Sequence, residues 1–367
     1  MIMKIIDAFS RYFVGGLFIF SGLIKLNDPI GTKIKLEEYF EVFSVDFASF
    51  FEWFIPLALP LGMFLIILEL ALGVAVLLNY KMPLTTWVLL VLILFFTFLT
   101  FYSAQFNKVT DCGCFGDAIP LNPWQSFFKD VILIVFIGHL FWYRKKYTQA
   151  VAEKTGHIIV GATVFVSLIV GIYALAHLPY IDFRPYKVGN NIPEQMIPAE
   201  QPIIEYVFDK DGEEVSSREF LTEEEGYKYV DSRIVNEEAT IAKITDFQVM
   251  GPEGEDFTEQ TFQGLKVLII MHDTKELTYK ALPELAEFIN SLEGKIETVA
   301  FTAIPEAEFE NIRHEYQLAV PYYFLDWTVL KAMIRSNPGI MLLKDGTVLG
   351  KWHINDIPDG GQLAELL

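Results

Sequence analysis

Five stretches of this sequence are long and apolar enough to cross a lipid bilayer, and they constrain the fold more than any other feature. A helix needs about 20 apolar residues to span about 30 Å of hydrocarbon. The stretches are residues 8–26, 57–78, 84–104, 124–143 and 157–177. Hydrophobic residues make up 52% of the 367, so a single water-soluble globule would expose more apolar surface than water tolerates. The first half is therefore predicted to be a helical membrane bundle.

The formal net charge of −19 is confined to the second half of the chain. Residues 1–185 contain 13 acidic and 13 basic residues, whereas residues 186–367 contain 34 acidic and 15 basic residues. This division indicates a membrane domain joined to an acidic soluble domain. Nucleic acid is not an expected partner, because phosphates would repel so acidic a chain without a basic stripe. We expect a four-span domain at 1–145, a fifth span at 146–178, a linker with a small β-rich segment at 179–243, and an α/β domain at 244–367.

Basic residues predict how the spans are oriented, because loops rich in lysine and arginine stay in the cytoplasm. Arg144, Lys145 and Lys146 lie between the fourth and fifth spans. The N-terminus is then inside, and five spans place the C-terminal domain on the periplasmic side of a bacterial cytoplasmic (inner) membrane. Two longer loops face the same side: residues 27–56, with an amphipathic helix around 36–43, and residues 105–123.

The loop 105–123 contains the two cysteines of the chain, Cys112 and Cys114, separated by one glycine. Thiols on the outer side of a bacterial membrane meet an oxidising environment. A disulfide closing a three-residue loop contributes only about 1.6 kcal/mol of loop entropy, so it would be a weak structural brace. We favour thiol–disulfide exchange, with a structural bond and metal binding as alternatives. The neighbouring Asp111 and Asp117 are hard ligands that match soft thiolates poorly.

Charged residues also lie within the predicted spans. Glu69 is about 18 Å from the outer end of its helix, and Arg11 is about 22 Å from the outer end of the first span. A charge at such a depth costs about 2.5–3.5 kcal/mol, so a partner is expected. The similar depths predict an Arg11–Glu69 pair, and Lys25 and Asp130 form a second candidate pair nearer the surface. The pairs either fix helix packing or line a proton path or a quinone-type pocket below the thiols.

In the first span, the run Gly-Leu-Phe-Ile-Phe-Ser-Gly at residues 16–22 lies between Arg11 and Lys25, and Glu69 lies on the second span. This pattern resembles DoxX-type membrane proteins. The resemblance implies a four-helix membrane bundle, to which this chain adds a fifth transmembrane helix. It also implies that Arg11, Lys25 and Glu69 line the interior of the bundle.

The cysteine loop resembles the related MauE, or methylamine-utilisation, group. The resemblance rests on Cys-Gly-Cys-Phe-Gly at residues 112–116, which precede a span that begins at Trp124. The resemblance covers residues 1 to about 145. It implies a redox role for Cys112 and Cys114, either in disulfide formation in exported proteins or in quinone-coupled sulfur chemistry.

The second half begins with residues 179–198, whose four prolines predict an extended linker at the membrane surface. In residues 202–243 we expect a hairpin with strands at 203–208 and 213–216, and a helix that begins at Thr222. From residue 244 strands and helices alternate and end in a hairpin, which predicts an α/β domain. Its strands are expected at 246–250, 265–271, 298–302, 322–325, 340–343 and 348–351, and its helices at 277–292, 306–316 and 327–335.

This order of elements resembles a thioredoxin-like domain of the TlpA or peroxiredoxin type. Leu-Pro-Glu-Leu at 282–285 resembles its first helix, and Pro338 lies where that family places a cis-proline before a strand. Counting back from Pro283 puts the family's Cys-x-x-Cys at Lys275 to Thr278. Neither Lys275 nor Thr278 can exchange disulfides, so dithiol chemistry in this domain is excluded.

Two functions fit these patterns. The first is a component of periplasmic thiol–disulfide or quinone-linked redox chemistry through Cys112 and Cys114, in which the outer domain recruits a partner. The second is a non-enzymatic envelope scaffold or assembly factor whose outer domain binds a partner protein. In both cases the partners are the lipid bilayer and a periplasmic or envelope protein. No metal is expected, and a membrane quinone is the one candidate cofactor.

Overall fold

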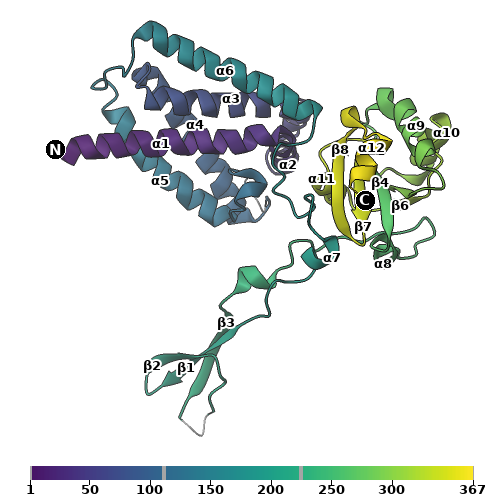
Figure 1. Ribbon diagram of the computed structural model, residues 1–367. Coiled ribbons are helices and arrows are strands. Elements are labelled where there is room, and N and C mark those ends of the chain that lie inside the picture. The colour runs from purple at the N-terminus through teal and green to yellow at the C-terminus, as the bar shows by residue number, and fades with distance from the viewer. Residues whose placement is uncertain (1, 110–112, 223–225, 367) are drawn as a thin grey trace. The chain divides into compact units, whose positions relative to one another are not determined.

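The computed structural model describes residues 2–109, 113–222 and 226–366, and the chain divides into two compact units (Figure 1). The first unit is Met1–Phe183 and the second is Arg184–Leu367. The first unit is helical and the second contains both sheets. The predicted order of a membrane bundle followed by an α/β domain is therefore confirmed.

Within the described part of the first unit, five helical stretches are long and apolar enough to cross a membrane, and they coincide with the five predicted spans. The 3₁₀ helix η1 (Ser49–Leu57) leads directly into the second of them. The additional helix α2 includes the segment 36–43, where the sequence predicts a helix. The α-helices are α1 (Ile2–Asn27), α2 (Pro29–Asp46), α3 (Ala58–Leu77), α4 (Met82–Phe106), α5 (Pro123–Trp142) and α6 (Glu153–Ala176).

Glycines set the spacing between α1 and α3. A Cβ atom on Gly73 would lie 2.9 Å from the carbonyl oxygen of Gly15, and one on Gly22 would lie 2.6 Å from Leu70 Cγ. Small residues at such positions let the backbones of membrane helices approach closely. The contacts define an antiparallel register in which Gly15 lies against Leu77 and Gly22 against Leu70.

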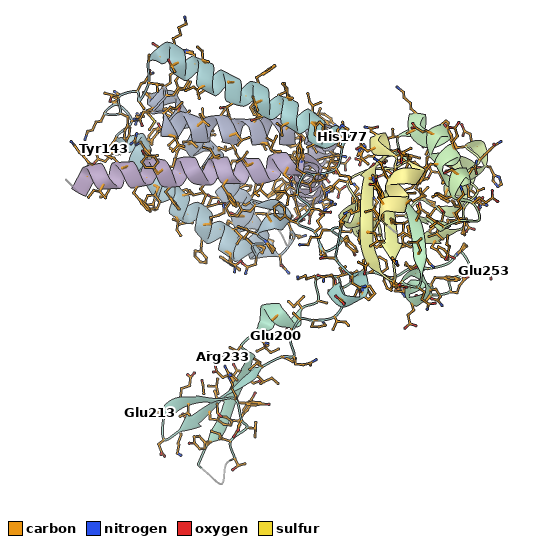
Figure 2. The ribbon with its side chains drawn as sticks, in the orientation of Figure 1. Tyr143, His177, Glu200, Glu213, Arg233 and Glu253 are labelled. Carbon is orange, nitrogen blue, oxygen red and sulfur yellow. The ribbon has the colours of Figure 1, made fainter. Side chains whose placement is uncertain are left out.

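The other helices complete the bundle around this pair. Helix α4 packs on α5, and α6 packs on α3. Tyr143, just after α5, lies at the end of the bundle where α1 begins, and His177, just after α6, lies at the opposite end (Figure 2). We call these the Asp7 end and the Asn27 end. Large apolar side chains such as Val91 and Phe165 are exposed on the bundle, as expected of a surface that faces lipid.

The second unit is built on a five-stranded sheet with the order β6-β5-β4-β7-β8. The central strand β4 is parallel to β5 and antiparallel to β7. Val267, Ile269 and Met271 of β4 pack in one core with Leu285 and Ile289 of α9. The strands are β4 (Leu265–Met271), β5 (Glu297–Thr302), β6 (Tyr322–Phe324), β7 (Gly339–Lys344) and β8 (Thr347–His353), and the helices are α8 (Thr258–Thr261), α9 (Leu282–Leu292), α10 (Glu306–Glu315), α11 (Trp327–Met333) and α12 (Gly360–Glu365).

A second, three-stranded antiparallel sheet has the order β2-β1-β3. The predicted hairpin is present as β1 (Ile204–Lys210) and β2 (Glu213–Ser217), joined by a turn in which Asp211 and Gly212 both have positive φ. Such a turn matches the twist of the two strands. Strand β3 (Lys228–Ile234) was not predicted. All of its residues are exposed, so its sequence lacks the alternation of apolar and polar residues that marks a half-buried strand. The expected helix start at Thr222 runs into residues 223–225, which lie outside the described residues.

Two predicted elements of the α/β domain differ from the structure. Residues 246–250 form no strand and pair only through isolated bridges of Met250 with Asp256 and Phe324. The helix expected at 277–292 begins as α9 at Leu282, because the N–H of Thr278 is bound by the carbonyl of Asn337 outside any helix. Pro283 then occupies the first turn of α9, where its missing N–H costs nothing.

The second half of the proline-rich segment is attached to β8 rather than running free as a linker. The N–H of Gly189 donates to the carbonyl of Val348 at 2.8 Å, and that of Ile192 donates to Gly346 at 2.9 Å. A short helix, α7 (Ile192–Gln195), follows. The segment thereby covers part of an edge strand whose backbone groups would otherwise be unpaired.

Candidate functional site

A cavity lies where the loop between α4 and α5 folds against the last turns of α1. Its volume is about 80 Å³, and its walls are partly apolar, with Leu17, Phe96 and Leu133 among them. We call it the Glu69 cavity. Its wall also contains Cys114 of the loop and the polar side chains of Ser21, Lys25, Glu69, Lys129 and Asp130.

Glu69 is almost fully buried, and both of its carboxylate oxygens have partners on α1. Lys25 Nζ donates to Glu69 Oε1 at 2.6 Å, and the Ser21 hydroxyl lies 3.0 Å from Oε2. The side chains of Lys25 and Glu69 are 11% and 3% exposed. The ion pair therefore supplies the partner that a charge inside a membrane requires.

The predicted Arg11–Glu69 pair is wrong. Arg11 Nη1 instead donates to Asn79 Oδ1 at 2.6 Å, just beyond the end of α3. The register of Gly15 against Leu77 places Arg11 near the end of α3, whereas Glu69 faces the last turns of α1. Arg11 and Lys25 are about 21 Å apart along one helix, so Glu69 can reach only one of them. Depths counted from helix ends do not give the register between two helices.

The predicted Lys25–Asp130 pair is also wrong, because Asp130 has its own partners. Lys129 Nζ lies 2.5 Å from Asp130 Oδ1, and the Thr100 hydroxyl donates to Oδ2 at 3.1 Å. The Asp130 side chain is 1% exposed. Of the four predicted network residues, Lys25, Glu69 and Asp130 line the Glu69 cavity and Arg11 does not.

Residues 110–112 of the cysteine loop lie outside the described residues, and with them Cys112 and any bond between the two cysteines. Gly113 and Gly116 have φ of +64° and +50°, in the region that favours glycine. The N–H of Gly116 donates to the carbonyl of Gly113 at 3.2 Å, which closes a tight turn around Cys114 and Phe115. Glycine at both positions permits this turn without backbone strain.

Two contacts attach this turn to α1. The Cys114 carbonyl oxygen lies 2.9 Å from the Ser21 hydroxyl, and the ring of Phe115 lies 5.5 Å from that of Phe20. Cys114 itself is half-buried. Residues 113–116 therefore lie at the rim of the Glu69 cavity.

Ser21 and Lys129 are missing from the predicted network. A signal for Ser21 is present in the sequence, since it lies four residues before Lys25 and so on the same face of α1. Lys129 directly precedes Asp130, a spacing that does not normally bring two helical side chains together. Its pairing could only be found in the tertiary structure.

A second polar group lies at the Asp7 end of the bundle. Asp7 accepts from the Tyr147 hydroxyl at 3.1 Å and lies 2.7 Å from His139 Nε2. Burial and the hydrogen bond to Asp7 raise the pKa of Tyr147. Between this group and Ser21, α1 contributes the buried apolar residues Val14 and Phe18. The two polar groups are therefore separated by an apolar layer.

In the second unit, one of the two positions that correspond to the thioredoxin thiols, Thr278, contacts the residue before the cis-proline. The Asn337–Pro338 peptide bond is cis, as the sequence predicts. The N–H of Thr278 donates to the carbonyl of Asn337 at 2.9 Å, whereas Lys275 is exposed. The backbone features expected of a thioredoxin-like site are present, but the side chains of Lys275 and Thr278 contain no sulfur.

His272 is part of a charged cluster in the second unit, and its backbone N–H donates to Asn337 Oδ1 at 3.2 Å. Its Nδ1 lies 2.8 Å from Asp273 Oδ2, and the ligand atoms of His272, Asp273 and Glu276 lie within 4.8 Å of one another. Lys331 Nζ is 3.9 Å from Glu276, which opposes a cation there. Burial raises the pKa of Asp273, but the hydrogen bond with His272 and the charges of His272 and Lys331 outweigh it, so the pKa is lowered.

Comparison with known proteins relates part of the membrane unit to a described family. Residues 3–143 match the family model described as methylamine utilisation protein MauE. The match lies within the membrane unit. A curated relative, Protein TlpB of Flavobacterium psychrophilum, is 27% identical over 172 residues, which are 45% of this chain and 43% of that protein. The alignment thus spans less than half the length of the relative.

Proposed function

We propose that this MauE-domain protein is a thiol–disulfide redox component in which Cys112 and Cys114 cycle between dithiol and disulfide. The observation that carries the proposal is the place of Cys114 on the wall of the Glu69 cavity, beside two buried carboxyl groups that are each paired with a lysine. Oxidation of two thiols forms one S–S bond and releases two electrons and two protons. Carboxyl groups next to the thiols can accept and pass on such protons.

The electron acceptor is either a disulfide of a partner protein or a membrane quinone. A quinone would take up the two electrons and the two protons. The lining of the cavity supports this choice, since Phe96 and Leu133 supply apolar walls and Lys25 and Lys129 supply hydrogen-bond donors. Glu69 and Asp130 hold the two lysines in place and lie where protons are exchanged.

The second unit supports the reaction as a partner-binding domain, not as a thiol donor. Lys275 and Thr278 occupy its thiol positions, so electrons cannot pass through it by disulfide exchange. We place this unit and the cysteine loop on the periplasmic side of the bacterial inner membrane. The absence of thiols in the second unit also favours the alternative, a scaffold that binds an envelope protein.

The two functions are separated by the redox state of the cysteines in cells. Thiols are blocked rapidly, membranes are treated with or without reductant, and newly exposed thiols are labelled with a reagent that shifts the mass. We expect Cys112 and Cys114 to be partly oxidised during respiration and to become reduced when respiration is inhibited. The Cys112→Ser variant is the control, because it cannot form the intramolecular bond. A pair that stays fully reduced in respiring cells would rule out the redox function.

The acceptor is identified by two further arms of this experiment. Addition of a short-chain quinone to reduced membranes without oxygen should reoxidise the pair if a quinone is the acceptor. A mixed disulfide trapped by the Cys112→Ser or Cys114→Ser variant would instead identify a protein partner.

A further inference from the structure

Ser21 has one hydroxyl hydrogen and two acceptors within reach. Its Oγ lies 3.0 Å from Glu69 Oε2 and 2.9 Å from the Cys114 carbonyl oxygen. A serine hydroxyl donates a single hydrogen bond, although it can accept others. Ser21 therefore cannot donate to both groups while Glu69 is a carboxylate. Once Glu69 carries a proton, its O–H can donate to Ser21, and the Ser21 hydrogen becomes available to Cys114.

We propose that Ser21 is a positioning residue for Cys114, and that the protonation of Glu69 decides whether Ser21 holds the cysteine loop. With Glu69 ionised, the Ser21 hydrogen goes to the carboxylate, because hydrogen bonds to charged groups are roughly twice as strong as neutral ones. With Glu69 protonated, a chain of hydrogen bonds runs from Glu69 through Ser21 to the Cys114 carbonyl. The loop is then attached to α1 more firmly.

Other groups around the cavity act on the same equilibrium. Lys25 Nζ lies 2.6 Å from Glu69 Oε1, so its charge faces the carboxyl group directly. Helix α6 packs on α3 and carries no titratable group between His157 and Tyr173. Helix α4 contributes the uncharged Thr100 to the cavity. The remaining titratable groups on its wall are Lys35 and Tyr39 of α2, Cys114 of the loop, and Lys129 and Asp130 of α5.

The test measures how fast Cys114 reacts with a maleimide in membranes that contain the full-length Cys112→Ser protein, at pH values from 5 to 8. At each pH, the rate of the Ser21→Ala protein is divided by the rate of the protein that keeps Ser21. This ratio removes the ordinary effect of pH on the fraction of Cys114 that is thiolate, because both proteins are measured at the same pH. We expect this ratio to be near one at high pH. At low pH it should rise to about threefold to tenfold, as expected for loss of one hydrogen bond.

Three variants show whether Glu69 controls this effect. In the Glu69→Gln protein the side-chain amide can donate to Ser21 at every pH, so the ratio should be raised throughout and lose its pH dependence. Ser21→Thr keeps the hydroxyl and should restore the parent rate. Ser10→Ala is the matched control, since Ser10 is a buried serine of the same helix whose hydroxyl has no hydrogen-bond partner among the described residues. It should leave the rate unchanged.

The outcomes also separate this proposal from the proposed function on which it rests. A ratio of one at every pH, in the parent and in the Glu69→Gln protein, overturns the role of Ser21. A raised ratio that neither pH nor Glu69→Gln changes overturns the control by Glu69. Redox cycling is measured independently in cells. A pair that never cycles, together with the expected ratios, removes the redox function and leaves Ser21 as a positioning residue of the loop.

Discussion

Two cations of one helix, Lys25 and Arg11, satisfy their charges in different ways. Lys25 forms an ion pair with Glu69, whereas Arg11 donates to the neutral side chain of Asn79. Asn79 in turn donates to the carbonyl of Thr148 at 2.9 Å, so the Arg11 contact belongs to the polar group at the Asp7 end. Removal of one member of a buried ion pair leaves the other charge without compensation. The two cations should therefore respond differently to substitution of Glu69.

We expect Lys25→Met and Glu69→Leu each to lower the free energy of unfolding by about 3–5 kcal/mol. The double variant should be less unstable than the sum of the two, with a coupling energy of about 1–3 kcal/mol. Arg11→Met combined with Glu69→Leu should be additive within about 0.5 kcal/mol, because the two residues share no contact. Denaturant titration in detergent micelles measures all of these values. An Arg11–Glu69 coupling as large as that of Lys25 and Glu69 would contradict the register of α1 and α3.

Asp273 gives the second unit a specific sensitivity to acid. Its pKa is lowered from 3.8, so the folded state favours the carboxylate. The resulting stabilisation is present above the unfolded pKa and is lost as the pH falls through the lower, folded pKa. We expect β4 to lose protection below about pH 4 and the Asp273→Asn variant to lose less of it. Hydrogen exchange of the β4 amides, compared between both proteins at the same pH, measures the difference. An identical acid dependence would show that Asp273 is not responsible.

At the level of elements, glycines let the backbones of α1 and α3 approach closely. The atoms nearest to a Cβ on Gly73 include the carbonyl oxygen of Gly15 and the backbone nitrogen of Ile19. Backbone atoms cannot move aside as the end of a flexible side chain can. Gly16 is on the same helix as Gly15, but a Cβ there would have nothing within 4 Å. The two positions therefore form a matched pair for substitution.

Gly73→Ala should push α1 and α3 apart and lower the free energy of unfolding by about 1–3 kcal/mol. It should also weaken the Lys25–Glu69 contact, which depends on the same helix pair. Gly16→Ala should be neutral or stabilise the protein by up to about 1 kcal/mol, because alanine has the higher helix propensity. Thermal unfolding in detergent measures both effects. Equal effects of the two substitutions would mean that the close approach does not set the helix spacing.

At the level of the whole molecule, the basic run that predicts the orientation lies at one end of the bundle and the cysteine loop at the other. Tyr147 contacts Asp7, so the basic run that precedes it, Arg144 to Lys146, lies at the Asp7 end. The loop that carries Cys114 lies at the Asn27 end, since it contacts Ser21 and Ile24. The basic cluster and the cysteine loop are therefore at opposite ends. If the basic cluster is cytoplasmic, the cysteines and the residues that follow α6 face the periplasm.

Protease treatment of intact spheroplasts tests this orientation. We expect loss of the residues beyond about 180, while the basic loop 143–154 stays protected until the membrane is opened. Opened membranes serve as the control, because both regions are then accessible. Protection of the second unit in intact spheroplasts would reverse the orientation and place the cysteines in a reducing compartment.

The sequence by itself determined which segments are apolar enough to cross a membrane, most strands and helices of the α/β domain, and which family the membrane unit resembles. These features depend on runs and periods of apolar residues along the chain, as in β4, whose continuous apolar run marks a fully buried strand. The cis-proline at 338 could likewise be predicted, because it follows from a known motif.

Only the tertiary structure decided which charged residues meet. Lys25 and Arg11 are equally plausible partners for Glu69 as long as each helix is considered alone. The choice depends on the register of α1 against α3, which glycines far apart in sequence set through backbone contact. The same holds for Glu276 beside Lys331 and for β3 beside β1, because neither pairing has a local signal. Contacts between distant segments are fixed by packing, and packing is a property of the folded chain.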